Sequence, residues 1–177
     1  MRIVLTLVLF FGLAGLAAAQ DDKTLEGPMT MQRMADIIFA IDPDATISQG
    51  RTIELTIDDI PVMVVADPLA NRMRAMVPIR SAEGMEASEL LRVMQANFDT
   101  ALDARYAVAQ GRLWAAFIHP LAQLEKDQLL SALVQTINLA RTYGAGYTGG
   151  AQHFGGGDSN GIYQGLLEEL RKKGEPL

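Results

Sequence analysis

The chain contains no cysteine, so neither disulfide bonds nor cysteine-ligated metal sites contribute to its stability. Histidine is scarce as well: His119 ends an apolar strand pattern, and His153 lies in a glycine-rich stretch. Neither an H-x-x-x-H nor an H-E-x-x-H spacing occurs, so we expect no zinc site and no cofactor. Stability must come from buried apolar side chains, and 177 residues can supply one domain with a sizeable core.

Basic residues form no extended cluster. The chain has 15 basic and 21 acidic residues, and removing Arg2 with a signal peptide would leave 14 against 21, a net charge of −7. The densest basic run, 171–173, is typical of cations in the last turn of a helix. Because phosphate backbones are bound by clustered Lys and Arg, we expect no nucleic-acid partner.

Local catalytic motifs are also missing. No serine lies in a Gly-x-Ser-x-Gly context, and the glycine-rich stretch does not end in the Gly-Lys-Ser/Thr of a phosphate-binding loop. Neighbouring carboxylates such as Asp58 and Asp59 are as common in turns as in catalytic pairs. The sequence therefore predicts a non-enzymatic protein.

The N-terminus has the three parts of a secretory signal peptide. Met1-Arg2 is a short positive region, residues 3–16 are apolar, and Ala17-Ala18-Ala19 gives the small-residue cleavage pattern. The apolar run is shorter than the roughly 20 residues of a spanning helix, which argues against the alternative of a membrane anchor. We expect cleavage after Ala19, a periplasmic protein without stable membrane insertion, and release from the cell as the alternative location.

Residues 20–29 are polar and predict a flexible leader, and residues 30–144 predict one α+β domain. Thr30 can cap a helix that ends near Asp42-Pro43. The apolar residues then alternate with polar ones over 52–58 and 72–79, on either side of a β-branched run at 62–66. Short turns between these segments predict an antiparallel meander.

A helix, a hairpin and a second helix are expected next, between Met85 and Gly144. Leu90, Leu91, Met94 and Phe98 form the apolar face of the first helix. Residues 105–109 and 112–119 form a hairpin around Gln110-Gly111, where Gly111 can adopt the positive φ of a tight turn. Both faces of the second strand are apolar, so we expect both to be covered, one of them by a partner subunit.

Residues 145–161 predict a flexible glycine-rich linker, and residues 162–177 a short amphipathic helix and tail, which could dock on its own domain or on a partner. Trp114, the only tryptophan, could fill the core or an interface. The expected protein-binding or dimer surface comprises Leu113, Trp114, Phe117, Ile118, Leu166, Leu167 and Leu170.

A Leu90-Leu91 to Asn97 run precedes the hairpin, and Ile118-His119-Pro120-Leu121 leads out of it. With the element order α-β-β-β-α-β-β-α, this arrangement resembles the type III secretion chaperone-like proteins, which include the Tir-chaperone and YbjN-like families. The resemblance implies an antiparallel sheet packed with helices, a homodimer, and binding of protein segments without catalysis. We therefore expect an exported protein-interaction or chaperone-like domain of YbjN type. The alternative is a periplasmic small-ligand-binding protein or enzyme with a pocket between sheet and helices.

Overall fold

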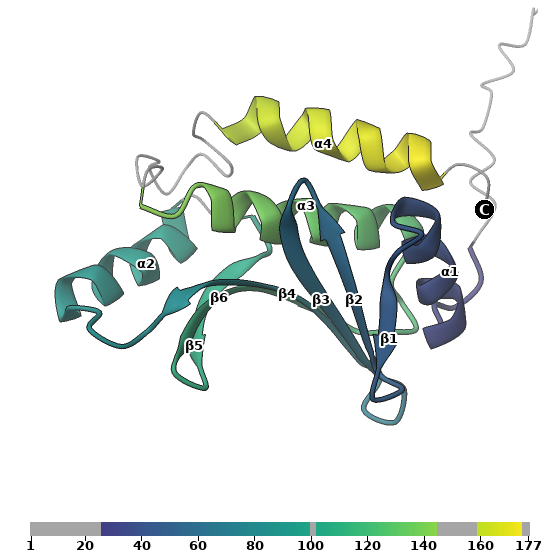
Figure 1. Cartoon of the computed structure of the whole chain (residues 1–177), viewed down its shortest axis with the longest axis horizontal. Helices are drawn as coiled ribbons and strands as arrows, with labels where there is room; N and C mark the ends of the chain where they lie inside the picture. The colour runs from purple at the N-terminus through teal and green to yellow at the C-terminus, as the bar shows by residue number, and fades with distance from the viewer. Residues whose placement is uncertain (1–25, 100–101, 145–158, 175–177) are drawn as a thin grey trace, which may run out of the picture.

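The computed structural model describes residues 26–99, 102–144 and 159–174. Four helices and six strands follow one another in an α+β arrangement (Figure 1). Their bounds are α1 Met31–Ile41, β1 Thr46–Ser48, β2 Thr52–Ile57, β3 Ile60–Asp67, β4 Arg72–Ser81, α2 Ala87–Asp99, β5 Arg105–Ala109, β6 Arg112–His119, α3 Lys126–Arg141 and α4 Ser159–Gly174.

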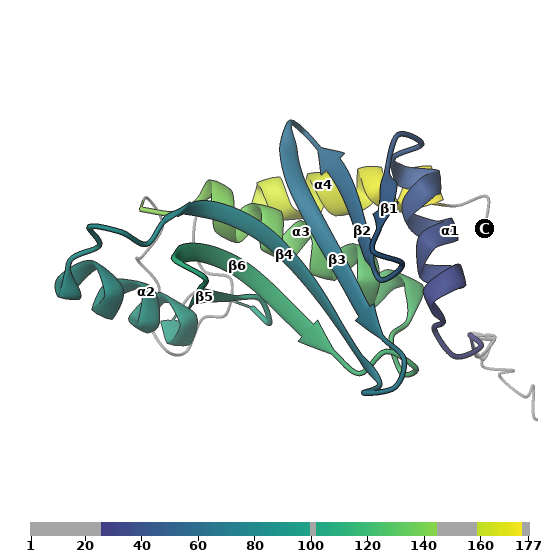
Figure 2. The same ribbon diagram turned by 60° about the horizontal axis from the view of Figure 1, so that its bottom comes forward.

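The strands form one antiparallel sheet in the order β1-β2-β3-β4-β6-β5 (Figure 2). The predicted meander of β2, β3 and β4 and the predicted hairpin of β5 and β6 are confirmed. β6 pairs with β4, and β5 therefore becomes an edge strand. The three-residue strand β1 was not predicted, and it forms the opposite edge.

Both two-residue hairpin turns have positive φ at each central residue, as in type I′ turns, whose twist matches that of the flanking strands. The expected turn between β5 and β6 has φ values of 51° at Gln110 and 69° at Gly111. The turn between β2 and β3 lies at Asp58 and Asp59, with φ values of 48° and 63°. Ile60 and Pro61, which we expected in that turn, are the first residues of β3.

One face of the sheet is packed against α3, which crosses strands β4 and β6. Alternate side chains of β2, β3, β4 and β6 point into this core, and α3 buries residues on nearly every side along its middle. The buried side chains of the four strands are Ile53, Leu55, Ile57, Val62, Val64, Ala66, Met73, Ala75, Val77, Leu113, Ala115 and Phe117. The period-2 patterns of β2 and β4 thus correctly identified the core face of these two strands.

The opposite face of the sheet is not covered by any helix in the described part of the chain (Figure 1). On β6, Trp114 and Ala116 are half-buried and Ile118 is 57% exposed. The single chain therefore covers one face of this strand, and cover of the other face by a partner subunit stays a prediction. An apolar strand pattern indicates that a strand has apolar side chains on both faces, but it does not identify the element or partner that buries them.

The segment just before α1 is anchored to the domain. Met29 is buried, and its N–H donates to the Ala122 carbonyl at 3.3 Å. The carboxylate of Glu26 accepts a hydrogen bond from the Lys126 N–H at 2.9 Å, at the start of α3. Residues 26–29 therefore do not behave as the expected flexible leader, while residues 1–25, with the predicted signal peptide, lie outside the described residues.

Helix α4 begins at Ser159, three residues before the predicted start, and packs on α3 and α1. Leu166, Leu167 and Leu170 are buried in this contact. The structure thus places the C-terminal helix on its own domain. Of the predicted linker at 145–161, residues 145–158 lie outside the described residues and residues 159–161 belong to α4. Within residues 26–99, 102–144 and 159–174, no helix combines the length and apolar character needed to span a membrane.

Candidate functional site

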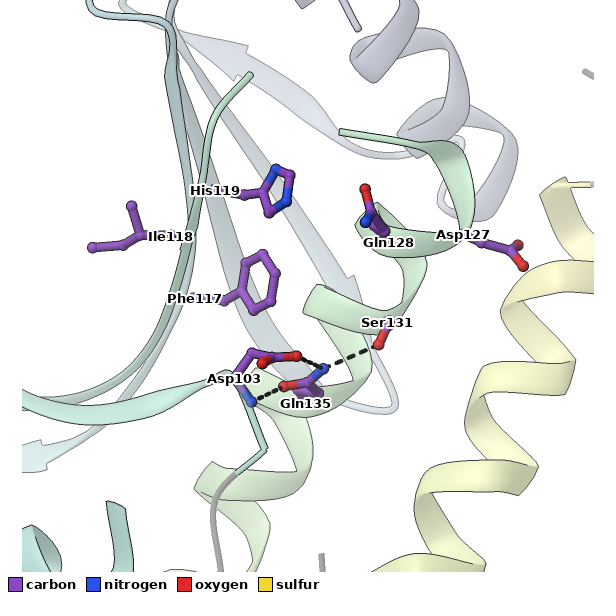
Figure 3. Close-up of a pocket in the computed structure, with 8 residues that line it drawn as sticks. All are labelled: Asp103, Phe117, Ile118, His119, Asp127, Gln128, Ser131 and Gln135. Carbon is purple, nitrogen blue, oxygen red and sulfur yellow. Dashed lines mark hydrogen bonds between the residues drawn. The ribbon is translucent and has the colours of Figure 1, made fainter. Parts of the chain in front are cut away.

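A cavity of about 430 Å³ lies between β6 and the N-terminal half of α3 (Figure 3). Its position matches the sequence-based alternative of a small-ligand pocket between sheet and helices. The lining residues are Asp103, Phe117, Ile118, His119, Asp127, Gln128, Ser131 and Gln135.

The polar groups of this cavity bond mainly to one another. The side-chain oxygen of buried Gln135 accepts from the N–H groups of Asp103 and Ala104, at 2.8 and 3.0 Å. Its amide nitrogen donates to the Asp103 carboxylate at 3.2 Å and to the Ser131 hydroxyl at 3.1 Å. Ser131 in turn bonds to the Tyr163 hydroxyl at 2.8 Å. Because two donors and two acceptor sites are all a glutamine side chain offers, Gln135 has none left for a ligand.

His119 is held in a similar way. Its ring stacks on Phe117 with centroids 6.1 Å apart, and its Nδ1 lies 2.8 Å from the Pro120 carbonyl oxygen. A carbonyl can only accept, so Nδ1 carries the proton in this bond. In the described part of the chain, no hydrogen bond joins His119 to a serine, and no group of three or more His, Asp or Glu side chains could hold a metal ion. These bonds give the cavity residues a structural role, because they join α3 both to the loop that precedes β5 and to α4.

The largest group of exposed apolar side chains lies on α2. Leu91, Met94 and Phe98 follow the i, i+3, i+7 spacing of one helical stripe and are 70%, 62% and 69% exposed; Leu90 flanks the stripe. We call these four residues the α2 apolar face. The sequence identified this face, but the helix contacts its own domain through the opposite side, where Val93 and Ala96 are buried.

Polar contacts fix the position of α2. The Asn97 side chain donates to the Tyr106 carbonyl at 3.1 Å and accepts from the Tyr106 N–H at 2.7 Å. Glu89 pairs with Arg80 of β4 at 3.3 Å and accepts a hydrogen bond from the Tyr143 hydroxyl. Burial of the Tyr143 phenol and its contact with the Glu89 carboxylate raise the pKa of Tyr143. The α2 apolar face is thus held outward by bonds at both ends of the helix.

A second exposed surface lies on the uncovered side of the sheet. Cross-strand register places Arg74 beside Ile118, Met76 beside Ala116, and Pro78 beside Trp114. The pairing of β3 with β4 and of β5 with β6 continues these rows to both sides. We call the surface the open sheet face; its members on β3 to β6 are Pro61, Met63, Val65, Asp67, Arg72, Arg74, Met76, Pro78, Arg105, Ala107, Arg112, Trp114, Ala116 and Ile118.

The structure divides the predicted binding residues between core and surface. Trp114 and Ile118 lie on the open sheet face, whereas Leu113 and Phe117 point to the other side of β6 and are buried in the core. Successive strand residues face opposite ways, so residues 113 and 117 cannot share a surface with 114 and 118. The three leucines of α4 are buried against the domain itself. Placement in the core corrects the expectation that all seven form one surface.

The sequence pointed to Arg72 and Arg74 as a candidate binding edge, but not to Arg105 and Arg112, which share a face with Trp114. Arg112 has the same strand parity as Trp114, and its guanidinium carbon lies 5.9 Å from the indole centroid. Arg105 is opposite Ala116 across the β5–β6 ladder. The signal that could have revealed them is the absence of acidic residues from all three strands 72–81, 105–109 and 112–119.

Neither a protein-family model nor a curated protein sequence matches this chain. Solved structures similar to it include the HopA1–SchA chaperone–effector complex, at 10% identity and a TM-score of 0.48, covering 64% of this chain and 97% of the other. The Yersinia pestis type III secretion chaperone SycH with a fragment of YscM2 gives 15% identity and a TM-score of 0.48, covering 62% and 98%. The ExsC–ExsE complex gives 12% identity and a TM-score of 0.45, covering 55% and 77%.

Two of these structures contain a chaperone by name, as the resemblance of the element order to type III secretion chaperone-like proteins led us to expect. With TM-scores below 0.5, the likeness describes a similar arrangement of helices and strands. The partners named in those complexes are known for those proteins, and the likeness assigns none of them to this chain. For this chain, the class defined by fold and surfaces is an α+β domain with one face of its sheet, and one helix, left uncovered.

Proposed function

We propose that this chain is an exported, non-enzymatic, chaperone-like protein-binding domain of YbjN type, and that it forms a homodimer through the α2 apolar face. The observation that carries the proposal is the exposure of Leu91, Met94 and Phe98 in one helical stripe. Contiguous apolar surface of this kind on a soluble domain marks an interaction site, because leaving it in water costs free energy that a partner would recover.

A second copy of the chain is the partner that this stripe suits best. In a two-fold dimer each chain uses the same patch, so two α2 helices would cross with their apolar faces together. Few polar groups would have to be buried, because Asn97 and Glu89 already bond within their own chain. The charge on α2 is low, since the helix carries Glu89, Arg92 and Asp99 and no run of like charges.

Light scattering with size-exclusion chromatography of residues 20–177 tests the dimer. We expect twice the chain mass at micromolar concentration, and the monomer mass for the double variant Leu91→Asp with Met94→Asp. Leu69→Asp is the matched control, because it also replaces an exposed apolar residue by aspartate but lies away from α2. Leu69 is 92% exposed on the β3–β4 turn. A monomeric wild-type chain at all concentrations would overturn the dimer, and a dimer that survives the double variant would place the interface elsewhere.

The proposed location is the periplasm, with release from the cell as the alternative. It is supported by the positive, apolar and small-residue regions of residues 1–19, and the absence of cysteine is compatible with an oxidising compartment. The proposed likeness to secretion chaperones is therefore binding of protein segments, with partners of its own. An exported chain would meet other proteins than those chaperones serve.

A further inference from the structure

The open sheet face combines an apolar centre with positive charge. Met76 and Ala116 lie side by side at its middle, flanked by the pairs Arg74–Ile118 and Pro78–Trp114. Each of these side chains belongs to β4 or β6, which lie between β3 and β5 in the sheet. In Figure 1 the helices α3 and α4 lie on the other side of these strands. The apolar centre is thus open to a partner without any rearrangement of the fold.

The arginines on this surface outnumber the acids, although the whole chain has a net charge of −6. Strands β4, β5 and β6 contain no acidic residue, and four of their arginines share the open sheet face. These four are Arg72, Arg74, Arg105 and Arg112. Among the described residues none of the four forms an ion pair, whereas Arg80, on the other side of β4, pairs with Glu89.

Internal contacts position three of these arginines without neutralising them. Arg72 donates to the Asn71 carbonyl at 2.9 Å, Arg105 donates to the carbonyls of Leu102 and Ala104, and Arg112 lies over Trp114. A guanidinium has five N–H donors, so each keeps donors for a further group, and its planar fork matches a carboxylate. Charged hydrogen bonds of this kind are the stronger ones available at a surface.

The acids on the same side of the sheet lie on β2 and at the end of β3, where Asp67 is opposite Arg72. Glu54 is on β2 and accepts a hydrogen bond from the Ser48 hydroxyl, and Asp67 at the end of β3 accepts from the N–H groups of Leu69 and Ala70. A hollow of about 430 Å³ lies at this boundary, and Arg72, Arg74 and Asp67 line it together with Val65, Met76 and Ile118. A long polyanion would meet Glu54 and Asp67, whereas a short segment that runs from Arg74 toward Arg112 leads away from Asp67.

We propose that the open sheet face binds an acidic, apolar-rich segment of a partner protein. Carboxylates of the segment bond to Arg74 and Arg112, and its apolar side chains pack on Met76, Ala116 and Ile118. Met63 and Met76 are opposite each other on β3 and β4, and the pliable methionine side chain lets one surface accept several sequences. This inference rests on the proposed protein-binding function and names the chemistry of the ligand, while the dimer uses different residues.

The test is selection of random 12-residue displayed peptides on immobilised residues 20–177. We expect the enriched peptides to be rich in Asp or Glu together with Leu, Ile, Phe or Met. The double variant Arg74→Glu with Arg112→Glu should weaken binding of a chosen peptide by at least about tenfold, since two charged hydrogen bonds are lost and two repulsions are gained. Lys172→Glu, at an exposed position of α4, is the matched charge reversal and should change binding by less than about twofold.

Circular dichroism confirms that the variants are folded, and Arg74→Gln with Arg112→Gln replaces the reversal if they are not. Enrichment of basic peptides, or of none, would overturn the proposal. Tighter binding of a phosphatidylglycerol vesicle or a single-stranded oligonucleotide, lost in the same variant, would also overturn it and assign the face to that ligand. The Leu91→Asp with Met94→Asp variant in the same assay separates the two proposals. If this variant is monomeric and still binds peptide, the open sheet face binds independently of the dimer. The dimer itself is decided by the light-scattering experiment.

Discussion

At the scale of single residues, Asn97 acts as a substitute for a missing strand. β5 is an edge strand, and the Asn97 amide bonds to both the N–H and the C=O of Tyr106. Asn97→Ala is expected to lower the free energy of unfolding by about 1–3 kcal/mol, because two backbone groups lose their partners. Urea denaturation followed by circular dichroism measures the change.

Asn97→Asp is the informative control for this prediction. An aspartate can still accept from the Tyr106 N–H, but an ionised carboxylate cannot donate to the Tyr106 carbonyl. Its cost should therefore lie between zero and that of the alanine variant. An alanine variant as stable as the wild type would show that water satisfies Tyr106 equally well.

Tyr143 provides a pH-dependent prediction at the same scale. Burial of the phenol, followed by its hydrogen bond to Glu89, raises its pKa above the ordinary value near 10. The stabilising contribution of Tyr143 should be complete below the ordinary pKa and be lost as pH rises through the raised one. The ultraviolet absorbance of phenolate, measured as wild type minus Tyr143→Phe, should show this late titration. In Glu89→Gln the titration should shift back toward the ordinary pKa; no shift would leave burial as the sole cause.

How much of this could be read from the sequence depends on the range of each interaction. The Thr30 cap, which accepts from the Arg33 N–H at 3.1 Å, and the turn at Gly111 were predicted because both depend on neighbours within three residues. The bonds of Asn97 to Tyr106 and of Gln135 to Asp103 span 9 and 32 positions. Neither residue type nor local pattern indicates such partners.

At the scale of elements, α4 can be tested as a unit that docks on the domain. Leu170 is fully buried, and Arg171 pairs with Asp127 of α3 at 2.9 Å. Leu170→Ala should lower the free energy of unfolding by about 2–5 kcal/mol and release α4 from the domain. Adding Leu167→Ala should then cost less than its own single effect, because an undocked helix has no further contact to lose.

Urea denaturation together with hydrogen exchange of α4 amides measures both effects. Leu69→Ala, at an exposed leucine, is the control and should change stability by no more than about 0.5 kcal/mol. Fully additive losses for Leu167 and Leu170 would mean that α4 does not undock separately. If the α4 amides of Leu170→Ala exchanged at the wild-type rate, the contribution of Leu170 to docking would be contradicted.

The elements also show where sequence patterns stop being informative. Period-2 alternation located β2 and β4, a β-branched run located β3, and the hairpin pattern located β6. β1 has only three residues and no buried one, so no pattern marked it. Helical spacing identified the apolar residues of α2 and α4 equally well. Only the tertiary packing separates them, since the leucines of α4 are buried and the α2 apolar face is exposed.

At the scale of the whole molecule, export and folding can be separated. The nearest described contacts to the expected cleavage site involve Glu26, which pairs with Arg33 and caps α3. Cleavage after Ala19 leaves all these contacts in the mature chain. We therefore expect the full-length chain, produced in a Gram-negative bacterium, to be recovered from the periplasmic fraction with Gln20 as its first residue by mass spectrometry. Ala17→Phe with Ala19→Phe should block cleavage, because the site requires small side chains at both positions, and leave the fold by circular dichroism unchanged. A cytoplasmic wild-type chain that retains residues 1–19 would contradict export, and the α2 and open-sheet surfaces would then have to be tested against cytoplasmic partners.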